Sequence, residues 1–174
     1  MKIIEAMKQL KELARKSDDL CAKVSQHCAD LDFETPLYGT SAEQAATVKG
    51  WIQSQHDILK EGLRLRTAIQ RTNLATSVTI TLGDKAVTKT IAEWIHRRRD
   101  LANTELKMWR SLGDRNLKEG QIPSSVPGGQ ARDVKIRRYY DPRERDAMVT
   151  LFASEPGTID ASLEVINATT DLIE

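Results

Sequence analysis

Apolar residues recur every three or four positions over the first 70 residues, a spacing that predicts two amphipathic helices. The first helix is expected over residues 1–32, where two rows of residues spaced by seven form a heptad stripe. These rows are Ile3, Leu10, Ser17, Val24 and Leu31, and Met7, Ala14, Cys21 and Cys28, with Ala6, Leu13 and Leu20 widening the stripe. We therefore expect both cysteines in the core rather than in a disulfide.

The second helix is expected over residues 42–70, after a break at residues 33–41. Its predicted buried face carries Ala45, Val48, Ile52, Leu59 and Leu63. A short connection favours an antiparallel hairpin over residues 1–70. Aromatic residues make up only 5% of the chain, so such a hairpin buries little surface alone. We expect a homo-oligomer, with the stripe of residues 3–31 in its interface.

The pattern changes after the hairpin. Residues 76–90 alternate threonine and serine with aliphatic residues around Gly83-Asp84, which predicts a small β-hairpin. A third helix is expected over 89–112, followed by a loop over 113–134 and a basic strand over 135–140. The next helix is expected to begin at Asp141-Pro142 and to end at about 153. A break at Glu155-Pro156-Gly157 precedes a last helix over 158–172. The expected fold is a mainly α single domain, 1–174, a long antiparallel helical hairpin or bundle with a β-hairpin insertion.

The net charge of +1 conceals three blocks of different sign. Residues 1–63 carry a net charge of −2, residues 64–145 carry +9, and residues 146–174 carry −6. Thirteen of the fourteen arginines lie in the middle block. Guanidinium groups suit phosphate and carboxylate partners, so this block is the place to look for a binding site.

Several function classes find no support in the sequence. It has no glycine-rich phosphate loop, no histidine or cysteine cluster at metal spacing, and no local triad signature. We therefore expect neither enzymatic activity nor a cofactor. No apolar run approaches the ~20 residues that span a bilayer, and residues 1–11 do not resemble a signal peptide. Two cysteines without such a peptide favour the cytoplasm, and we expect no membrane partner.

Three clusters could bind an anion, and each has a structural alternative. The first, where the second helix ends, contains Arg64, Arg66, Arg71, Thr72, Asn73, Thr76 and Ser77, of which Arg71, Asn73 and Thr76 are the most site-like. The second is residues 96–100 within the third helix, with Arg98 and Arg99 as its candidates. The third, in the basic segment, contains Lys135, Arg137, Arg138, Tyr139 and Tyr140, with Arg138 and Tyr139 as its candidates. The alternatives are capping of chain ends, ion pairs within the bundle, and an edge strand anchored by tyrosine. Arg98 follows the apolar stripe of its helix and is expected to need a buried partner, whereas Arg97 is expected to be exposed.

Residues 70–76, QRTNLAT, resemble the arginine-x-asparagine-x-x-threonine signature of the septicolysin-like family of small bacterial and phage proteins. A hairpin containing Gly83, a helix containing Arg99-Asp100 and a later Arg138-Tyr139 pair follow in similar order. Ala75 stands where the family pattern has a second asparagine. The resemblance implies a helical fold with a small β element and oligomerisation. The site-like positions that it marks are Arg71, Asn73, Thr76, Arg99, Arg138 and Tyr139.

These observations favour a non-enzymatic oligomeric protein that sequesters a small phosphate-bearing, nucleotide-type ligand in an arginine-rich pocket between subunits. A phage-encoded protein of this kind would act as a nucleotide sponge in the host cytoplasm. The alternative is a helical assembly protein, such as a scaffold or virion component. Nucleic-acid binding ranks third, because the C-terminal block is acidic and no recognised motif is present.

Overall fold

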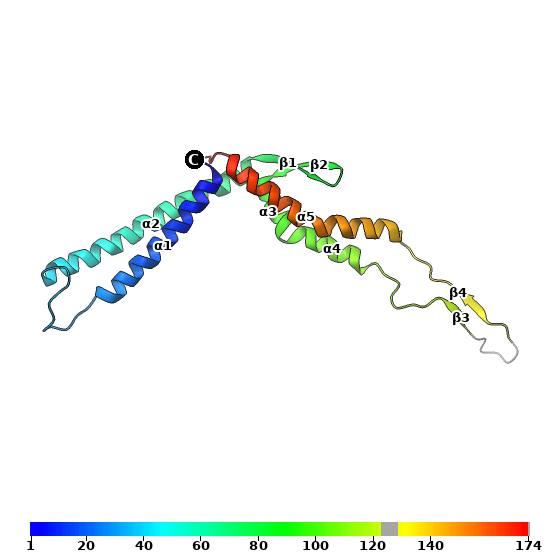
Figure 1. The fold of residues 1–174 in the computed structure, drawn as a ribbon, viewed down its shortest axis with the longest axis horizontal. Coiled ribbons are helices and arrows are strands. Elements are labelled where there is room, and N and C mark those ends of the chain that lie inside the picture. The colour runs from blue at the N-terminus through cyan, green and yellow to red at the C-terminus, as the bar shows by residue number, and fades with distance from the viewer. Residues whose placement is uncertain (123–128, 174) are drawn as a thin grey trace. The chain divides into compact units, whose positions relative to one another are not determined.

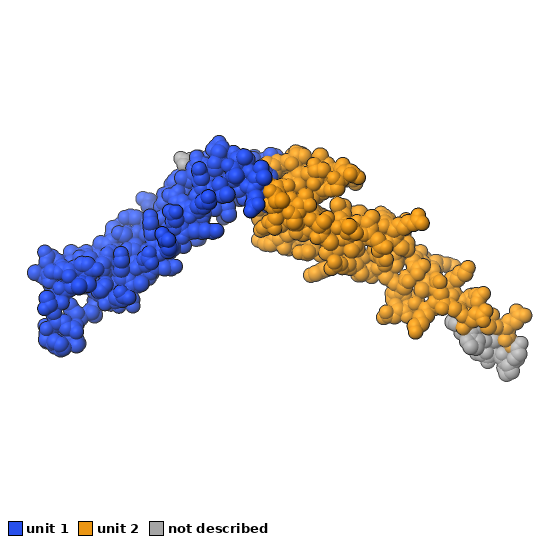
Figure 2. All heavy atoms as spheres, viewed as in Figure 1, with its two compact units in different colours: residues 1–77, 90–92, 163–174 blue, residues 78–89, 93–162 orange. Residues whose placement is uncertain are grey.

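The structure is a computed structural model that describes residues 1–122 and 129–173 (Figure 1). Contacts group the chain into two compact units (Figure 2). Unit 1 comprises residues 1–77, 90–92 and 163–174, and unit 2 comprises residues 78–89 and 93–162. The fold is mainly helical with a small β-hairpin, which confirms the expected fold class. None of the helices in the described ranges is long and apolar enough to cross a bilayer.

Unit 1 contains the expected antiparallel hairpin of α1 (Ile3–His27) and α2 (Ser41–Ala75). Hydrogen bonds between the helices fix their direction, because Gln55 Nε2 donates to Ser17 Oγ at 2.7 Å and Gln44 Nε2 donates to the His27 carbonyl at 2.8 Å. A capping box starts α2, in which Thr40 Oγ1 accepts from the backbone N–H of Glu43 and the Glu43 carboxylate accepts from that of Thr40.

The buried stripe of α1 differs from the expected one. Ile3 and Ala6 are buried, whereas the row of Met7, Ala14, Cys21 and Cys28 is exposed. The row that packs beside the first is therefore Ala6, Leu13 and Leu20, three residues away rather than four. The expectation that both cysteines lie in the core is wrong, because one partner helix covers only one side of a wide apolar stripe.

The buried face of α2 also differs from the prediction. Leu65, Ala68 and Thr72 are buried, all toward the C-terminal end of the helix. Ile52, Leu59 and Leu63 were expected in the core but are 47%, 59% and 67% exposed. The predicted row lies on the side of the hairpin that no other element of unit 1 covers.

The two chain ends meet in unit 1. The Ile3 N–H donates to the Thr170 carbonyl at 3.1 Å, and Lys2 Nζ pairs with the Asp171 carboxylate at 2.7 Å. The predicted last helix, 158–172, thus ends at residue 169, because the following residues pair with the N-terminus instead.

Unit 2 contains the expected β-hairpin, made of β1 (Ser77–Leu82) and β2 (Lys85–Thr90), whose end residues Ser77 and Thr90 belong to unit 1. Its two-residue turn begins with Gly83 at φ +59°, a conformation that glycine adopts without steric cost. Trp94 is fully buried, and its Nε1 donates to the Val78 carbonyl at 3.1 Å. The indole therefore holds the first strand against the next helix.

The third helical segment contains a π-helical turn. It consists of α3 (Ile91–His96), η1 (Arg97–Leu101) and α4 (Ala102–Ser111). Within η1 the Arg97 side chain is 18% exposed and that of Arg98 is 40% exposed, so the expected roles of these two arginines are reversed. A π turn holds more residues than an α turn, which changes the side of the helix that each following residue occupies.

Arg97 joins α5 (Pro142–Thr169) through a buried ion pair. Its Nε and Nη2 donate to the Glu155 carboxylate at 2.5 and 2.9 Å, while Nη1 and Nη2 donate to Glu105 on α4 at 2.8 and 2.9 Å. The guanidinium also lies 5.4 Å from the centre of the Phe152 ring. The hydrogen bonds to Glu105 and Glu155 hold the pKa of the Arg97 guanidinium above its ordinary value, although burial of the group acts to lower it.

The expected helix break at residues 155–157 is wrong, because α5 is continuous through Pro156. Phe152, Ile159 and Leu163 are buried on one face of α5, on both sides of the proline. Their packing and the Glu155 ion pair outweigh the hydrogen bond that the proline removes.

The loop expected over residues 113–134 contains two short strands, β3 (Gly120–Ile122) and β4 (Arg132–Val134). They pair antiparallel, with Gly120 opposite Val134. The strand expected over residues 135–140 is wrong, because strand pairing ends at residue 134. The part of the expected loop over 123–128 lies outside the described residues.

Replacing Arg97 should destabilise unit 2 strongly. Arg97→Met leaves the Glu155 carboxylate, 1% exposed, without its cation, and should lower the free energy of unfolding by about 3–5 kcal/mol. The double variant Arg97→Met/Glu155→Leu should recover most of this loss, and Arg99→Met on the exposed side serves as the control. Urea unfolding measures the difference. An equal loss in Arg97→Met and Arg99→Met would contradict the assigned role.

Pro156→Ala should stabilise the protein. Alanine restores an N–H donor for the carbonyl of Phe152, and proline is about 3 kcal/mol less favourable than alanine inside a helix. We expect a gain of about 1–3 kcal/mol in urea unfolding. Gly157→Ala is the matched control, with an expected gain of about 1 kcal/mol, because a Cβ there meets nothing within 4 Å. A loss of stability in Pro156→Ala would show that the native helix requires the proline.

Candidate functional site

Arg71, Asn73 and Thr76 lie at the end of α2 in unit 1, around the buried Thr72. Thr72 Oγ1 accepts from the Ile173 N–H at 2.9 Å, and the Thr72 carbonyl accepts from the Thr76 N–H at 2.9 Å. Arg71 is exposed, and Asn73 Oδ1 is buried without a hydrogen-bond partner among the described residues. Thr72 and Thr76 therefore stabilise chain ends here, as the structural alternative for this cluster proposed.

Arg98 and Arg99 are both paired within unit 2. Arg98 Nη1 bonds to the Asp160 carboxylate of α5 at 2.5 Å. Arg99 Nε lies 3.3 Å from the Asp100 carboxylate, and its Nη2 lies 3.1 Å from His96 Nδ1. Carboxylates of the same chain thus neutralise much of the charge of this cluster.

A cavity of about 350 Å³ lies in unit 2, between the residues that follow α4 and those that precede α5. It gathers three arginines and two tyrosines around one carboxylate, and it contains Arg138 and Tyr139 of the sequence-predicted site residues. The polar and aromatic residues that line it are Asp114, Arg115, Arg137, Arg138, Tyr139 and Tyr140. We call this feature the arginine–tyrosine cavity.

A bidentate ion pair holds the two sides of the cavity together. Arg138 Nε and Nη2 donate to the two Asp114 oxygens at 2.7 and 2.6 Å, and the Tyr140 hydroxyl lies 3.4 Å from Asp114 Oδ1. The Arg138 hydrogen bonds hold the Asp114 pKa below its ordinary value. Arg145 contacts two residues that line the cavity: its guanidinium lies 5.7 Å from the centre of the Tyr140 ring, and its Nη1 donates to the Leu112 carbonyl.

The remaining polar groups of the cavity are exposed. Tyr139 is 90% exposed, and neither Arg115 nor Arg137 makes an ion pair within the described ranges. Arg115 and Asn116 both have positive φ, 52° and 60°, a left-handed backbone that asparagine tolerates but that costs energy in arginine. Such backbone strain is found where a fold holds groups for a ligand.

The structure brings together only part of the predicted site. Arg138 and Tyr139 share the cavity, whereas Arg98 and Arg99 lie at the other end of α4, a helix of ten residues and about 15 Å. Sequence reasoning missed Asp114 and Arg115. The available signal was the Gly113–Asn116 segment after the third helix, because glycine and asparagine favour left-handed backbone where a helix ends.

Metal binding finds no support in the described part of the chain, where no group of three histidine, cysteine or acidic side chains is placed to hold an ion.

Comparisons with known proteins place the fold but not the function. No family model matches the chain, and no curated protein matches it. One similar solved structure is the crystal structure of a functionally unknown conserved protein from Corynebacterium diphtheriae. The two share 19% sequence identity with a TM-score of 0.56, and the match covers 99% of each chain. At this identity the similarity shows a common fold.

The ion pair between Arg138 and Asp114 should be visible in a titration. NMR of the Asp114 carboxyl carbon should give a pKa below the ordinary range for aspartate, and Arg138→Gln should raise it toward that range. Because the folded-state pKa is the lower one, the pair stabilises the fold above the unfolded-state pKa, and this is lost as the pH falls through the folded-state pKa. Arg137→Gln is the control and should leave the midpoint unchanged. An unchanged midpoint in Arg138→Gln would assign the shift to another group.

Proposed function

We propose that the chain is a non-enzymatic binding protein that sequesters a small phosphate-bearing ligand of the nucleotide type in the arginine–tyrosine cavity. The observation that carries the proposal is the convergence of three arginines and two tyrosines on one cavity of about 350 Å³. Cavities of about 300–1,000 Å³ suit small ligands and cofactors.

Charge supports the phosphate part of the proposal. Asp114 offsets one of the three cationic side chains, Arg138, and holds it in place. Arg115 and Arg137 then remain to bind phosphate oxygens, to which guanidinium donates paired hydrogen bonds. Each hydrogen bond to a charged group is worth about 1.5–3 kcal/mol, so two arginines supply enough free energy for a specific anion site.

Tyr139 supports the aromatic part of the proposal. Its ring is 90% exposed beside two arginines, an arrangement in which a nucleobase can stack while its phosphate meets the guanidinium groups. Stacking a base on an aromatic side chain contributes about 1–3 kcal/mol. A second subunit that covers Tyr139 would complete the pocket between subunits.

Two of the cavity groups that could act in catalysis are already engaged. The Ser111 hydroxyl donates to the Met108 carbonyl at 2.7 Å, and the Asp114 carboxylate accepts from Arg138. Binding without chemical conversion is therefore the simpler role for this cavity.

Isothermal titration of the full chain with cyclic and linear nucleotides tests the proposal. We expect heat of binding with at least one nucleotide, weaker binding of inorganic phosphate, and none of the corresponding nucleoside. Absence of heat with the whole panel would overturn the proposal. A short single-stranded oligonucleotide is included, and tight binding that falls steeply with salt would favour nucleic acid as the partner instead.

Variants then locate the binding site. Arg137→Gln should weaken nucleotide binding by about tenfold or more, and Tyr139→Ala should do so while Tyr139→Phe keeps the ring and the affinity. Asp114→Asn should strengthen phosphate binding, because it removes the carboxylate that competes for Arg138. The matched control is Arg132→Gln, an exposed arginine of β4 that does not line the cavity. An equal loss in Arg132→Gln and Arg137→Gln would indicate unspecific charge attraction.

The second candidate function is a helical assembly module. The exposed apolar side chains of the α1–α2 hairpin favour it, since Ile52, Leu59 and Leu63 lie outside any core. This role and ligand binding involve different units and are compatible with each other.

A further inference from the structure

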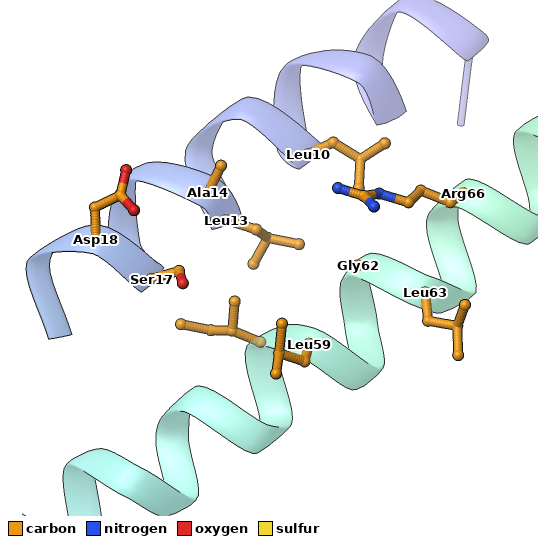
Figure 3. A pocket seen from close by; sticks show the side chains of 10 residues that line it. Leu10, Leu13, Ala14, Ser17, Asp18, Leu59, Gly62, Leu63 and Arg66 are labelled. Carbon is orange, nitrogen blue, oxygen red and sulfur yellow. The ribbon is translucent and has the colours of Figure 1, made fainter. Parts of the chain in front are cut away.

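The α1–α2 hairpin carries an apolar groove on one face, in unit 1 (Figure 3). The groove has a volume of about 270 Å³ and is lined on the α2 side by Leu59 and Leu63, which are 59% and 67% exposed. Ala14 lines the α1 side, and Met7 and Cys21 lie one heptad before and after it on the same helix face. Large apolar side chains so exposed on one face mark a surface that is covered in use.

Two charges of opposite sign flank this groove at its two ends. Asp18 on α1 lies at one end and Arg66 on α2 at the other, as Figure 3 shows. Neither side chain makes an ion pair within residues 1–122 and 129–173. A surface with opposite charges at its two ends complements itself after a rotation of 180°.

We propose that this groove binds a second copy of the chain in a two-fold symmetric dimer, in which Asp18 of each copy pairs with Arg66 of the other. A two-fold axis that lies in the contact plane, perpendicular to the line joining Asp18 and Arg66, stacks the faces of two hairpins so that they cross and brings each Asp18 opposite the Arg66 of the other copy. The result is an isologous four-helix arrangement, and both ion pairs form at once.

Small residues lie near the proposed two-fold axis. Ala14 precedes Asp18 by four residues on α1 and Gly62 precedes Arg66 by four on α2, so both lie between the two charges, where the crossing hairpins approach each other. Gly62 is not needed for packing within the chain, because a Cβ there would meet only Leu10 Cδ2, at an ordinary distance of 4.0 Å. A glycine inside a helix has a stability cost, and close approach of a second copy explains it.

Sedimentation velocity of the full chain over a wide range of concentration tests the dimer. The unchanged protein should show a monomer–dimer equilibrium. Asp18→Arg and Arg66→Asp should each weaken the dimer by about tenfold or more, because each introduces two like-charge contacts. An equimolar mixture of the two variants should restore the dimer, because every Arg then faces an Asp across the interface. The double variant Asp18→Arg/Arg66→Asp should restore it as well.

Asp19→Arg is the matched control, with the same change of charge at the next, exposed position of α1, and it should leave the dimer intact. Leu63→Glu provides a second disruption that leaves the core of the hairpin untouched, and should also give monomers. A monomeric unchanged protein at all concentrations would overturn the proposal. Single variants that dimerise normally, or a mixture of them that stays monomeric, would do the same. Each result is measured without a ligand, so it does not depend on whether the arginine–tyrosine cavity binds one.

Discussion

The ion pair between Arg97 and Glu155 is the interaction on which unit 2 depends. The Glu155 side chain is 1% exposed, and a carboxylate so deeply buried requires a cation with direct hydrogen bonds. Arg97 provides it from a different helical segment, 58 residues away in the chain, and also contacts Glu105 and the Phe152 ring. Arg97 thereby connects the third helical segment, α3–η1–α4, to α5. The π turn and the continuity of α5 are both consistent with this contact.

This pairing also explains the charge distribution along the chain. The arginine-rich middle block and the acidic C-terminal block neutralise each other in part, through Arg97 with Glu155 and Arg98 with Asp160. The near-zero net charge is thus partly an internal compensation. Arg115 and Arg137 at the arginine–tyrosine cavity take no part in this compensation, because the acidic residue of the cavity, Asp114, pairs with Arg138 among the described residues.

Two surfaces of the protein therefore remain available for partners, and they differ in chemistry. The cavity in unit 2 is cationic and aromatic, which suits a phosphate-bearing ring compound. The groove in unit 1 is apolar with one charge of each sign, Asp18 and Arg66, which suits a second copy of the same surface. The two proposals combine in a protein that dimerises through one unit and binds a ligand through the other.

The sequence alone determined the features that depend on residues close together in the chain. Among them are the helical hairpin, the turn at Gly83 and the start of α5 at Asp141-Pro142, where the Asp141 carboxylate accepts from the Arg143 N–H. Of the candidate site it predicted the basic–tyrosine segment but not Asp114. Only the tertiary structure decided which apolar rows are buried, that Arg97 rather than Arg98 is buried, and that α5 continues past its proline. Each of these depends on contacts between residues distant in the chain, which no local pattern records.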